Sequence, residues 1–198
     1  MSHLILYYIR KDVRYMCKYN KDLVEQRINE FKSKNYSHSD ITIYFDMDNT
    51  LCLFSVYGQE ELSMKAMYSK GFYKELPCFN EAPAVLENLQ NLGYKVKILS
   101  SCIDSPYCIP EKKAWVKYHL PFIDDKDIIL IPNGSSKAAV IENIESSILV
   151  DDYYHNIVGV YEAGGIGVKK TYSGKERPIP QVANLVDIFS VLDSLNCL

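Results

Sequence analysis

Apolar residues in this chain gather in short runs, and polar, turn-forming residues separate these runs from helical patterns. Each run is rich in Ile, Val, Leu and aromatic residues, and its length is typical of a β-strand. The runs are ITIYF (41–45), YKVKIL (94–99), DIILI (127–131), SSILV (146–150) and IGVKK (166–170).

Between these runs, apolar positions recur at three- and four-residue spacing, which predicts helices. The expected helices cover 84–92, 111–120, 136–144 and 153–163, and a last one has apolar positions from Val182 to Leu195. GGIG (164–167) is interpreted as the turn into the fifth strand. Strands that alternate with helices favour parallel pairing through right-handed crossovers. We therefore expect an α/β fold, with a parallel sheet between two layers of helices.

The first forty residues have a different pattern from the rest. Apolar spacing over 11–34 predicts one or two amphipathic helices, and NYSHSD (35–40) is typical of a loop. We expect residues 1–40 to be an N-terminal helical extension that packs on a core domain of residues 41–198.

Composition and charge exclude several classes of protein. With 198 residues, 47% of them hydrophobic and 24% charged, the chain is typical of one globular domain. The formal net charge is −3 and the basic residues are dispersed, so no nucleic-acid surface is evident. LILYYI near the start is too short for a signal or membrane segment. The six cysteines lack CxxC or Cys/His zinc spacing, and we predict reduced thiols and a cytoplasmic protein.

Reactive side chains follow four of the predicted strands. Because ligands of parallel α/β sheets bind at the carboxyl ends of the strands, we expect these side chains to meet. In chain order, they are Asp46 and Asp48, Ser100 and Ser101, Lys137, and Asp151 and Asp152.

Two carboxylates as close in the chain as Asp46 and Asp48 repel each other, and the candidates for offsetting that repulsion are a divalent cation, a phosphate chemistry or plain solvent exposure. Phosphoryl transfer needs a nucleophile in line with phosphorus, a cation and a proton donor. Asp46 is suited to attack phosphorus, and Asp48 to protonate the leaving oxygen and then activate water. Mg²⁺ suits an all-oxygen site of this kind.

The phosphate would be bound by hydroxyl, main-chain and lysine donors. We expect a hydroxyl of Ser100, the turn at Ser101 and main-chain N–H groups of Met47 and Asp48 to contact it. Lys137, at the start of an expected helix, would add its ammonium and the positive end of that helix.

The motifs DMDNTL, ILSS, NGSSK and LVDD resemble, in order and spacing, the four motifs of the haloacid dehalogenase (HAD) superfamily of phosphotransferases, over about residues 41–170. FYKELPCFNEAPAVLENL and EKKAWV resemble its 5'(3')-deoxyribonucleotidase branch less closely. The resemblance implies a three-layer Rossmann-like fold and a Mg²⁺-dependent phosphomonoesterase that forms an aspartyl-phosphate. Metal ligands would be Asp46, the Asp48 carbonyl and Asp152, with Asp151 orienting them; the last two are interchangeable at this point.

In this superfamily, a cap inserted after the first motif covers the site. Here the insert, at about 54–75, has room for one helix, QEELSMKAMYSKG (59–71), and is shorter than that of the nucleotidases. Phe54, Tyr57, Phe72 and Tyr73 either stack on a nucleobase or close the core. Lys112 or Lys113 either approaches the phosphate, as the resemblance suggests, or belongs to a solvated helix face.

The sequence thus predicts a Mg²⁺-dependent phosphomonoesterase acting on a small phosphorylated metabolite, with a (deoxy)nucleoside monophosphate as the leading hypothesis. One alternative is an inactive HAD-fold domain that serves as a binding or regulatory module. Another is a phosphatase acting on a phosphoprotein or on a nucleic-acid end. No partner protein is indicated.

Overall fold

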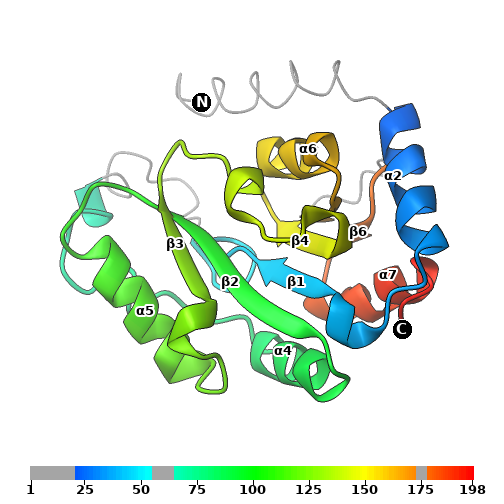
Figure 1. Cartoon of the computed structure of the whole chain (residues 1–198). Coiled ribbons are helices and arrows are strands. Elements are labelled where there is room, and N and C mark those ends of the chain that lie inside the picture. The colour runs from blue at the N-terminus through cyan, green and yellow to red at the C-terminus, as the bar shows by residue number, and fades with distance from the viewer. Residues whose placement is uncertain (1–20, 55–64, 173–177) are drawn as a thin grey trace.

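The computed structural model describes residues 21–54, 65–172 and 178–198, which contain a sheet of six parallel strands in the order β3-β2-β1-β4-β5-β6 (Figure 1). The five predicted strands are confirmed, and β6 was not predicted. The strands are β1 Thr42–Phe45, β2 Lys95–Cys102, β3 Ile128–Pro132, β4 Ser147–Asp151, β5 Ile166–Lys170 and β6 Gln181–Val182.

The register of the sheet brings the ends of its central strands level. Phe45, the last residue of β1, pairs with Ile98 on β2 and Val150 on β4. β2 continues beyond its predicted end, so Ser100 and Ser101 lie within the strand and pair with β3. Residues that follow β1 and β4 therefore share one edge of the sheet with the end of β2.

Helices cover both faces of the sheet. They are α2 Lys21–Ser33, α4 Ala82–Asn91, α5 Cys108–His119, α6 Tyr154–Ala163 and α7 Ile188–Ser194. Side chains alternate along β1, as they must in a strand. Ile43 and Phe45 join the core cluster that holds Trp115 of α5, while Tyr44 joins a second cluster with Val160 of α6. The predicted three-layer α/β fold is confirmed.

The predicted helix over 136–144 is wrong. This stretch contains a single 3₁₀ turn, Ala138–Val140, and a second turn, Ile144–Ser146, follows it. Asn143 between them has a φ of 48°, which no α-helix accommodates. Lys137 therefore does not begin an α-helix, and its predicted helix-end charge is lost.

The last predicted helix begins later than expected. Gln181–Val182 form β6 and Leu185–Asp187 a 3₁₀ turn, so α7 begins only at Ile188. The Asn184 side chain accepts a hydrogen bond from the N–H of Val186 at 3.0 Å, and this cap starts the turn.

The N-terminal segment and the insert are described only in part. α2 confirms a helix within 11–34, and its Val24 and Phe31 are buried in the main core. Residues 1–20 and 55–64 lie outside the described residues, so the predicted helix 59–71 is described only from residue 65 onward. Residues 67–75, apart from Ser69, form turns. The division into an extension and a core domain stays a prediction.

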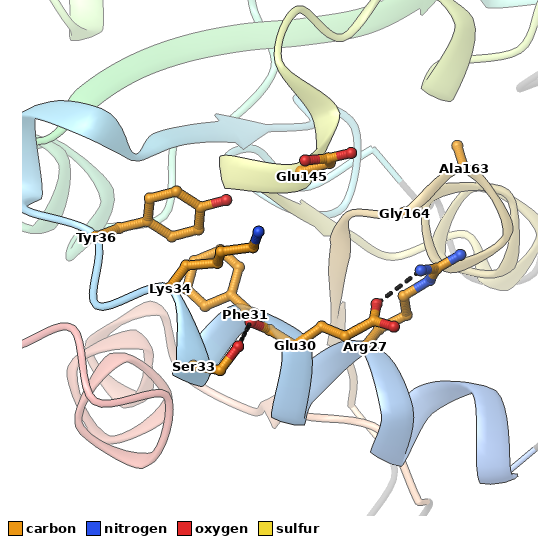
Figure 2. Close-up of a pocket in the computed structure, with 9 residues that line it drawn as sticks. All are labelled: Arg27, Glu30, Phe31, Ser33, Lys34, Tyr36, Glu145, Ala163 and Gly164. Carbon is orange, nitrogen blue, oxygen red and sulfur yellow. Dashed lines mark hydrogen bonds and ion pairs between the residues drawn. The ribbon is translucent and has the colours of Figure 1, made fainter.

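A cavity of about 500 Å³ lies between α2 and the C-terminal end of α6 (Figure 2). Because α6 runs back from the edge of the sheet where the strands have their carboxyl ends, this cavity lies at the opposite edge. Arg27 and Glu30, which form a 2.7 Å ion pair, line it with Lys34 and Glu145. It contains none of the predicted site residues.

Candidate active site

The first acidic motif is a tight turn at the end of β1. Asp46 still follows the strand, because its N–H donates to the carbonyl of Val150 at 2.9 Å. The Met47 carbonyl then accepts hydrogen bonds from the N–H groups of Leu51 at 2.9 Å and Cys52 at 3.0 Å. These bonds close the turn and fix Asp46 and Asp48 on one rigid loop.

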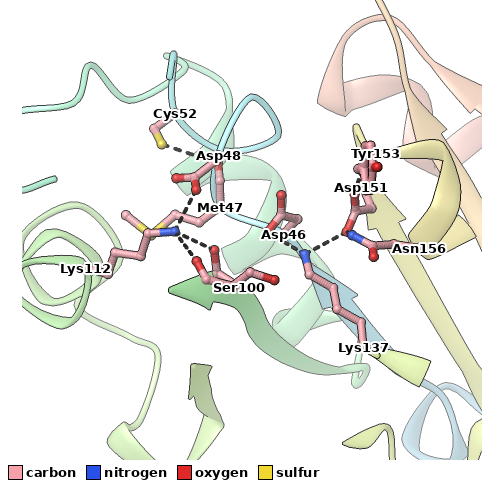
Figure 3. A network of polar contacts seen from close by, with 11 residues as sticks. Asp46, Met47, Asp48, Cys52, Ser100, Lys112, Lys137, Asp151, Tyr153 and Asn156 are labelled. Carbon is pink, nitrogen blue, oxygen red and sulfur yellow. Dashed lines mark hydrogen bonds and ion pairs between the residues drawn. The ribbon is translucent and has the colours of Figure 1, made fainter. Parts of the chain in front are cut away.

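Lys137 holds two acidic strand ends together. Its Nζ lies 2.6 Å from Oδ1 of Asp46 and 2.7 Å from Oδ2 of Asp151 (Figure 3). Asp151 also accepts from the N–H of Tyr153 at 2.6 Å and from Nδ2 of Asn156 at 2.9 Å. Donors therefore occupy both carboxylate oxygens of Asp151, which is fully buried.

Asp152 completes a group of three carboxylates. Asp46, Asp151 and Asp152 each offer one oxygen, and these oxygens lie within 4.8 Å of one another. Burial raises the pKa of Asp151 and, more strongly, the pKa of Asp152, and the neighbouring carboxylates raise both further. A divalent cation that prefers oxygen ligands, such as Mg²⁺, fits this group, because its charge would offset the repulsion.

Beside the three carboxylates, a second group of polar side chains, the Lys112 centre, consists of Lys112, Asp48 and Ser100. Nζ of Lys112 lies 2.7 Å from Oδ2 of Asp48, 2.9 Å from Oγ of Ser100 and 2.9 Å from the carbonyl oxygen of Ser101 (Figure 3). Burial lowers the pKa of Lys112, but the carboxylates of Asp48 and Asp46 outweigh it and the pKa is raised. The fully buried lysine thus stays charged.

The carboxyl group of Asp48 is only half satisfied. Burial raises its pKa, and the charge of Lys112 opposes this rise. Oδ1 of Asp48 is buried and has no hydrogen-bond partner among the described residues. A buried, unpaired oxygen is costly, so this atom is suited to a substrate oxygen.

Most predicted site residues meet at this edge, although their roles differ in weight. Ser101 presents its carbonyl to Lys112, and the Met47 side chain is buried in the core. Lys112, predicted only as a candidate lining residue, is at the centre, whereas Lys113 is exposed. EKKAWV was the signal for Lys112.

Three further polar residues were not predicted. Asn156 contacts Asp151, and the side chain of Asn49 opposes the rise in the pKa of the Asp152 carboxyl. Lys169 donates through Nζ to the main-chain carbonyl of Asp152, and its charge opposes the rise in the pKa of the Asp152 carboxyl. Only the neighbourhood of Asn49 in DMDNTL offered a sequence signal for any of them.

The aromatic residues of the insert lie beside the Lys112 centre. The rings of Phe54 and Phe72 are 5.7 Å apart, and those of Phe72 and Tyr73 are 5.0 Å apart. Nζ of Lys112 is 5.4 Å from the ring centre of Tyr73. Tyr73 is buried, while Phe54 and Phe72 are half-buried. Tyr57 lies outside the described residues.

Side chains of helix α5 form hydrogen bonds with residues 71–76, where the chain returns from the insert. The carboxylate of Glu111 accepts from the N–H groups of Gly71 at 2.6 Å and Tyr73 at 3.1 Å. Nε1 of Trp115 donates to the carbonyl of Leu76 at 2.7 Å. One helix therefore positions both Lys112 and the aromatic residues.

The rim on the Lys137 side is polar. A cavity of about 330 Å³ opens between the loop after β3 and the start of α6. It is lined by Ser101, Asn133, Gly134, Ser135, Ser136, Lys137, Ala138, Tyr153, His155, Asn156 and Gly159. The site thus has an aromatic side and a hydroxyl- and amide-rich side.

Solved structures with a similar fold include hydrolases of the HAD superfamily. A haloacid dehalogenase-like hydrolase from Streptococcus pneumoniae is 19% identical, with a TM-score of 0.55 over 77% of this chain and 99% of the other. A HAD hydrolase from Bacillus subtilis bound to magnesium is 13% identical, with a TM-score of 0.57 over 77% and 98%.

The D,D-heptose 1,7-bisphosphate phosphatase from B. bronchiseptica, complexed with magnesium and phosphate, is 10% identical, with a TM-score of 0.55 over 77% of this chain and 97% of the other. At these identities the likeness shows the fold. No curated protein matches the chain. Among the described residues, no helix is both long and apolar enough to cross a membrane.

A family model shows more than the structures do. The model for the 5' nucleotidase, deoxy (pyrimidine), cytosolic type C proteins matches residues 57–189, which include Ser100, Lys112, Lys137 and the Asp151–Asp152 pair. The match begins after Asp46 and Asp48, so the family model does not cover these two residues, and the case for them comes from the structure and from the DMDNTL motif. The predicted enzyme class, a phosphoric monoester hydrolase, is confirmed, and the chain belongs to the cytosolic type C 5'-deoxynucleotidase family within the HAD fold.

Proposed function

We propose that this protein is a Mg²⁺-dependent phosphomonoesterase that works through an aspartyl-phosphate and acts on a nucleoside monophosphate. The observation that carries the proposal is the separation of the first two aspartates. Lys137 holds Asp46 in the group of three carboxylates, whereas Lys112 holds Asp48 beside Ser100. The two carboxyl groups therefore have different surroundings, as a nucleophile and a proton donor require.

In the first step, a carboxylate oxygen of Asp46 attacks phosphorus, and the bond from phosphorus to the leaving oxygen breaks. Asp48 gives its proton to that oxygen, which leaves as the alcohol. Burial favours a protonated Asp48, because it raises the pKa of the carboxyl group. In the second step, Asp48 takes a proton from water, the water oxygen bonds to phosphorus, and the bond to Asp46 breaks to release phosphate.

The phosphoryl oxygens would be held by Lys112, by the hydroxyl of Ser100 and by main-chain N–H groups of Met47 and Asp48. Lys112 is suited to this role because it pairs with one carboxylate only and otherwise contacts two neutral oxygens. The turn at Ser101 would bound the phosphate on the β2 side.

Mg²⁺ would be held by Asp46, Asp152 and the main-chain carbonyl of Asp48, and when bound it supplies positive charge to the phosphoryl group. Asp152 is the better direct ligand, because donors already occupy both oxygens of Asp151. Asp151 orients Lys137 and the neighbouring ligands. Two of the similar structures are described as magnesium complexes, which supports the choice of metal.

The nucleoside would lie against Phe54 and Phe72, whose half-buried rings adjoin the Lys112 centre. Family membership supports a deoxynucleotide, and the aromatic residues supply a stacking surface for a base. Tyr73 closes the core beneath them. The cytoplasmic location stays a prediction.

The test is phosphate release from a panel that includes deoxynucleoside 5'- and 3'-monophosphates, sugar phosphates and a chromogenic ester. We expect Mg²⁺-dependent turnover that is highest with a deoxynucleotide. Asp46→Asn should lower kcat by about four orders of magnitude. Asp124→Asn, at an exposed acid, is the matched control. Equal phosphate release by the wild-type protein and Asp46→Asn would refute the proposal and favour a binding module.

A further inference from the structure

Cys52 and Cys78 pair with each other at the end of the turn that carries Asp46 and Asp48. Cys52 closes this turn, because its N–H donates to the Met47 carbonyl at 3.0 Å. Cys78 comes after the insert and forms an isolated antiparallel bridge with Cys52. The chain that returns from the insert is thereby joined to the turn.

The main-chain hydrogen bonds on both sides of this pair define its geometry. They run from the N–H of Leu53 to the carbonyl of Pro77 at 2.8 Å and from the N–H of Phe79 to the carbonyl of Leu51 at 2.9 Å. Cys52 and Cys78 lie between these bonds, so they are a non-hydrogen-bonded pair whose side chains leave the same face, with Cα atoms about 4.5 Å apart. A disulfide spans Cα separations of about 4.4–6.8 Å, so the backbone already suits one.

Both thiols are free in this structure. Sγ of Cys52 donates to the Met47 carbonyl at 3.3 Å (Figure 3). Sγ of Cys78 donates to the Phe79 carbonyl at 3.4 Å. Cys52 is fully buried in the main core cluster, and the half-buried Cys78 packs against that cluster. Rotation about the two Cα–Cβ bonds would therefore bring the sulfurs together, and an oxidant would reach Cys78 first.

We propose that Cys52 and Cys78 are a redox-sensitive pair, and that their disulfide ties the turn after β1 to the returning insert and lowers turnover. The oxidant is a hydroperoxide. Only the effect on turnover rests on the proposed function, because formation of the disulfide requires no substrate and no metal.

The oxidation proceeds in two steps. The sulfur of Cys78 attacks one oxygen of the peroxide, the O–O bond breaks, and water leaves a sulfenic acid on Cys78. The sulfur of Cys52 then attacks the sulfur of Cys78, the S–O bond breaks, and a second water leaves. The two thiols lose two electrons and two protons in all, and the peroxide is reduced to two molecules of water.

Both thiols react slowly at rest. Burial raises the pKa of Cys52 well above its usual range and that of Cys78 to about 11, so both are protonated at neutral pH. The thiolate is the reactive form, and sustained exposure to peroxide is therefore needed to close the pair.

The disulfide would draw Sγ of Cys52 away from the Met47 carbonyl, which is the acceptor that closes the turn. Asp48 follows Met47 directly, and a displacement of about 1 Å in a catalytic group costs up to about 100-fold in rate. The same bond closes a loop between residues 52 and 78, so it lowers the entropy of the unfolded chain and raises the Tm.

The experiment exposes the full chain to millimolar hydrogen peroxide for several hours and maps disulfide-linked peptides by mass spectrometry. We expect a link between Cys52 and Cys78, a Tm that is higher by about 5 °C or more, and a kcat that is lower by about tenfold or more. Dithiothreitol should reverse all three changes. Cys78→Ser should show none of them, whereas Cys197→Ser, at another buried cysteine, should respond as the wild-type protein does.

Peroxide-treated wild-type protein without a link between Cys52 and Cys78 would overturn the inference. A complete link that leaves kcat unchanged in an active enzyme would overturn it too, as would an equal loss of kcat in Cys78→Ser. A link with a raised Tm in a protein that hydrolyses no phosphomonoester would instead refute the proposed function alone.

Discussion

Lys112 and Lys137 are both buried lysines that contact the first acidic motif, but their charge surroundings differ. Lys137 pairs with two carboxylates, those of Asp46 and Asp151. Lys112 pairs with Asp48 alone and otherwise contacts neutral oxygens. The charge of Lys137 is therefore more than balanced within the protein, whereas Lys112 can share its charge with an incoming phosphate. Burial alone does not tell a structural lysine from a substrate-binding one.

The largest effect is expected when Lys137 is replaced. Lys137→Met leaves buried carboxylates without their cation, so the free energy of unfolding without Mg²⁺ should fall by about 3–5 kcal/mol. Activity should be almost abolished. Because Mg²⁺ binds the same acids, it should restore part of the stability. Urea unfolding with and without Mg²⁺ measures this, with the exposed Lys126→Met as control. Wild-type stability in Lys137→Met would contradict the comparison.

Lys112→Met should lower kcat/KM for the substrate much more than it weakens Mg²⁺ binding. Loss of one charged donor from the phosphoryl group should lower kcat/KM by about 100-fold or more. The Kd of Mg²⁺ should change little, because Lys112 contacts none of the three clustered carboxylates. Steady-state kinetics and calorimetry on one preparation give both values. Equal losses of metal and phosphate binding would show that the two lysines share one role.

The group of three carboxylates, Asp46, Asp151 and Asp152, should make Mg²⁺ binding dependent on pH. Because the pKa values of Asp151 and Asp152 are raised, these carboxyls keep protons at pH values where a free carboxyl has lost them. Mg²⁺ must displace those protons, so its affinity weakens as pH falls, by up to about tenfold per pH unit for each proton displaced. Calorimetry across a pH series checks this. An affinity independent of pH would contradict it.

The smallest effect concerns the aromatic side of the site. Phe72→Ala removes a ring on which a base would stack, so KM for a nucleoside monophosphate should rise about 2- to 10-fold. KM for glycerol phosphate should stay unchanged, because that substrate has no base. Tyr118→Ala, at an exposed ring on α5, is the control. A uniform rise for both substrates would assign Phe72 to the core instead.

The sequence predicted the sheet and the acids because both follow from local pattern. ITIYF alternates between two buried faces, and the residues after it must stand at a strand end. The helix over 136–144 failed for a tertiary reason. Its apolar residues have helical spacing, yet Ile141 packs on the sheet from between two 3₁₀ turns. Packing overrode a weak local preference.

The place of Lys112 was also beyond the reach of local pattern. Lysine is seldom fully buried, so a solvated helix face was a reasonable interpretation. Its burial depends on Asp48 and Ser100, which are far away in the chain. The contact of Lys169 with the main-chain carbonyl of Asp152 likewise joins residues that are apart in the sequence, and single-sequence spacing carries no record of such pairs.

The hydrogen bonds between helix α5 and residues 71–76 have a consequence for the evolution of substrate specificity. Glu111 and Trp115 hold the chain that carries the aromatic residues, and Lys112 between them holds the proton donor. Any tilt of this one helix moves both together. Variants selected for a new leaving group by changes beneath α5 should therefore shift turnover as well, so that substrate preference and rate are inherited as a linked pair.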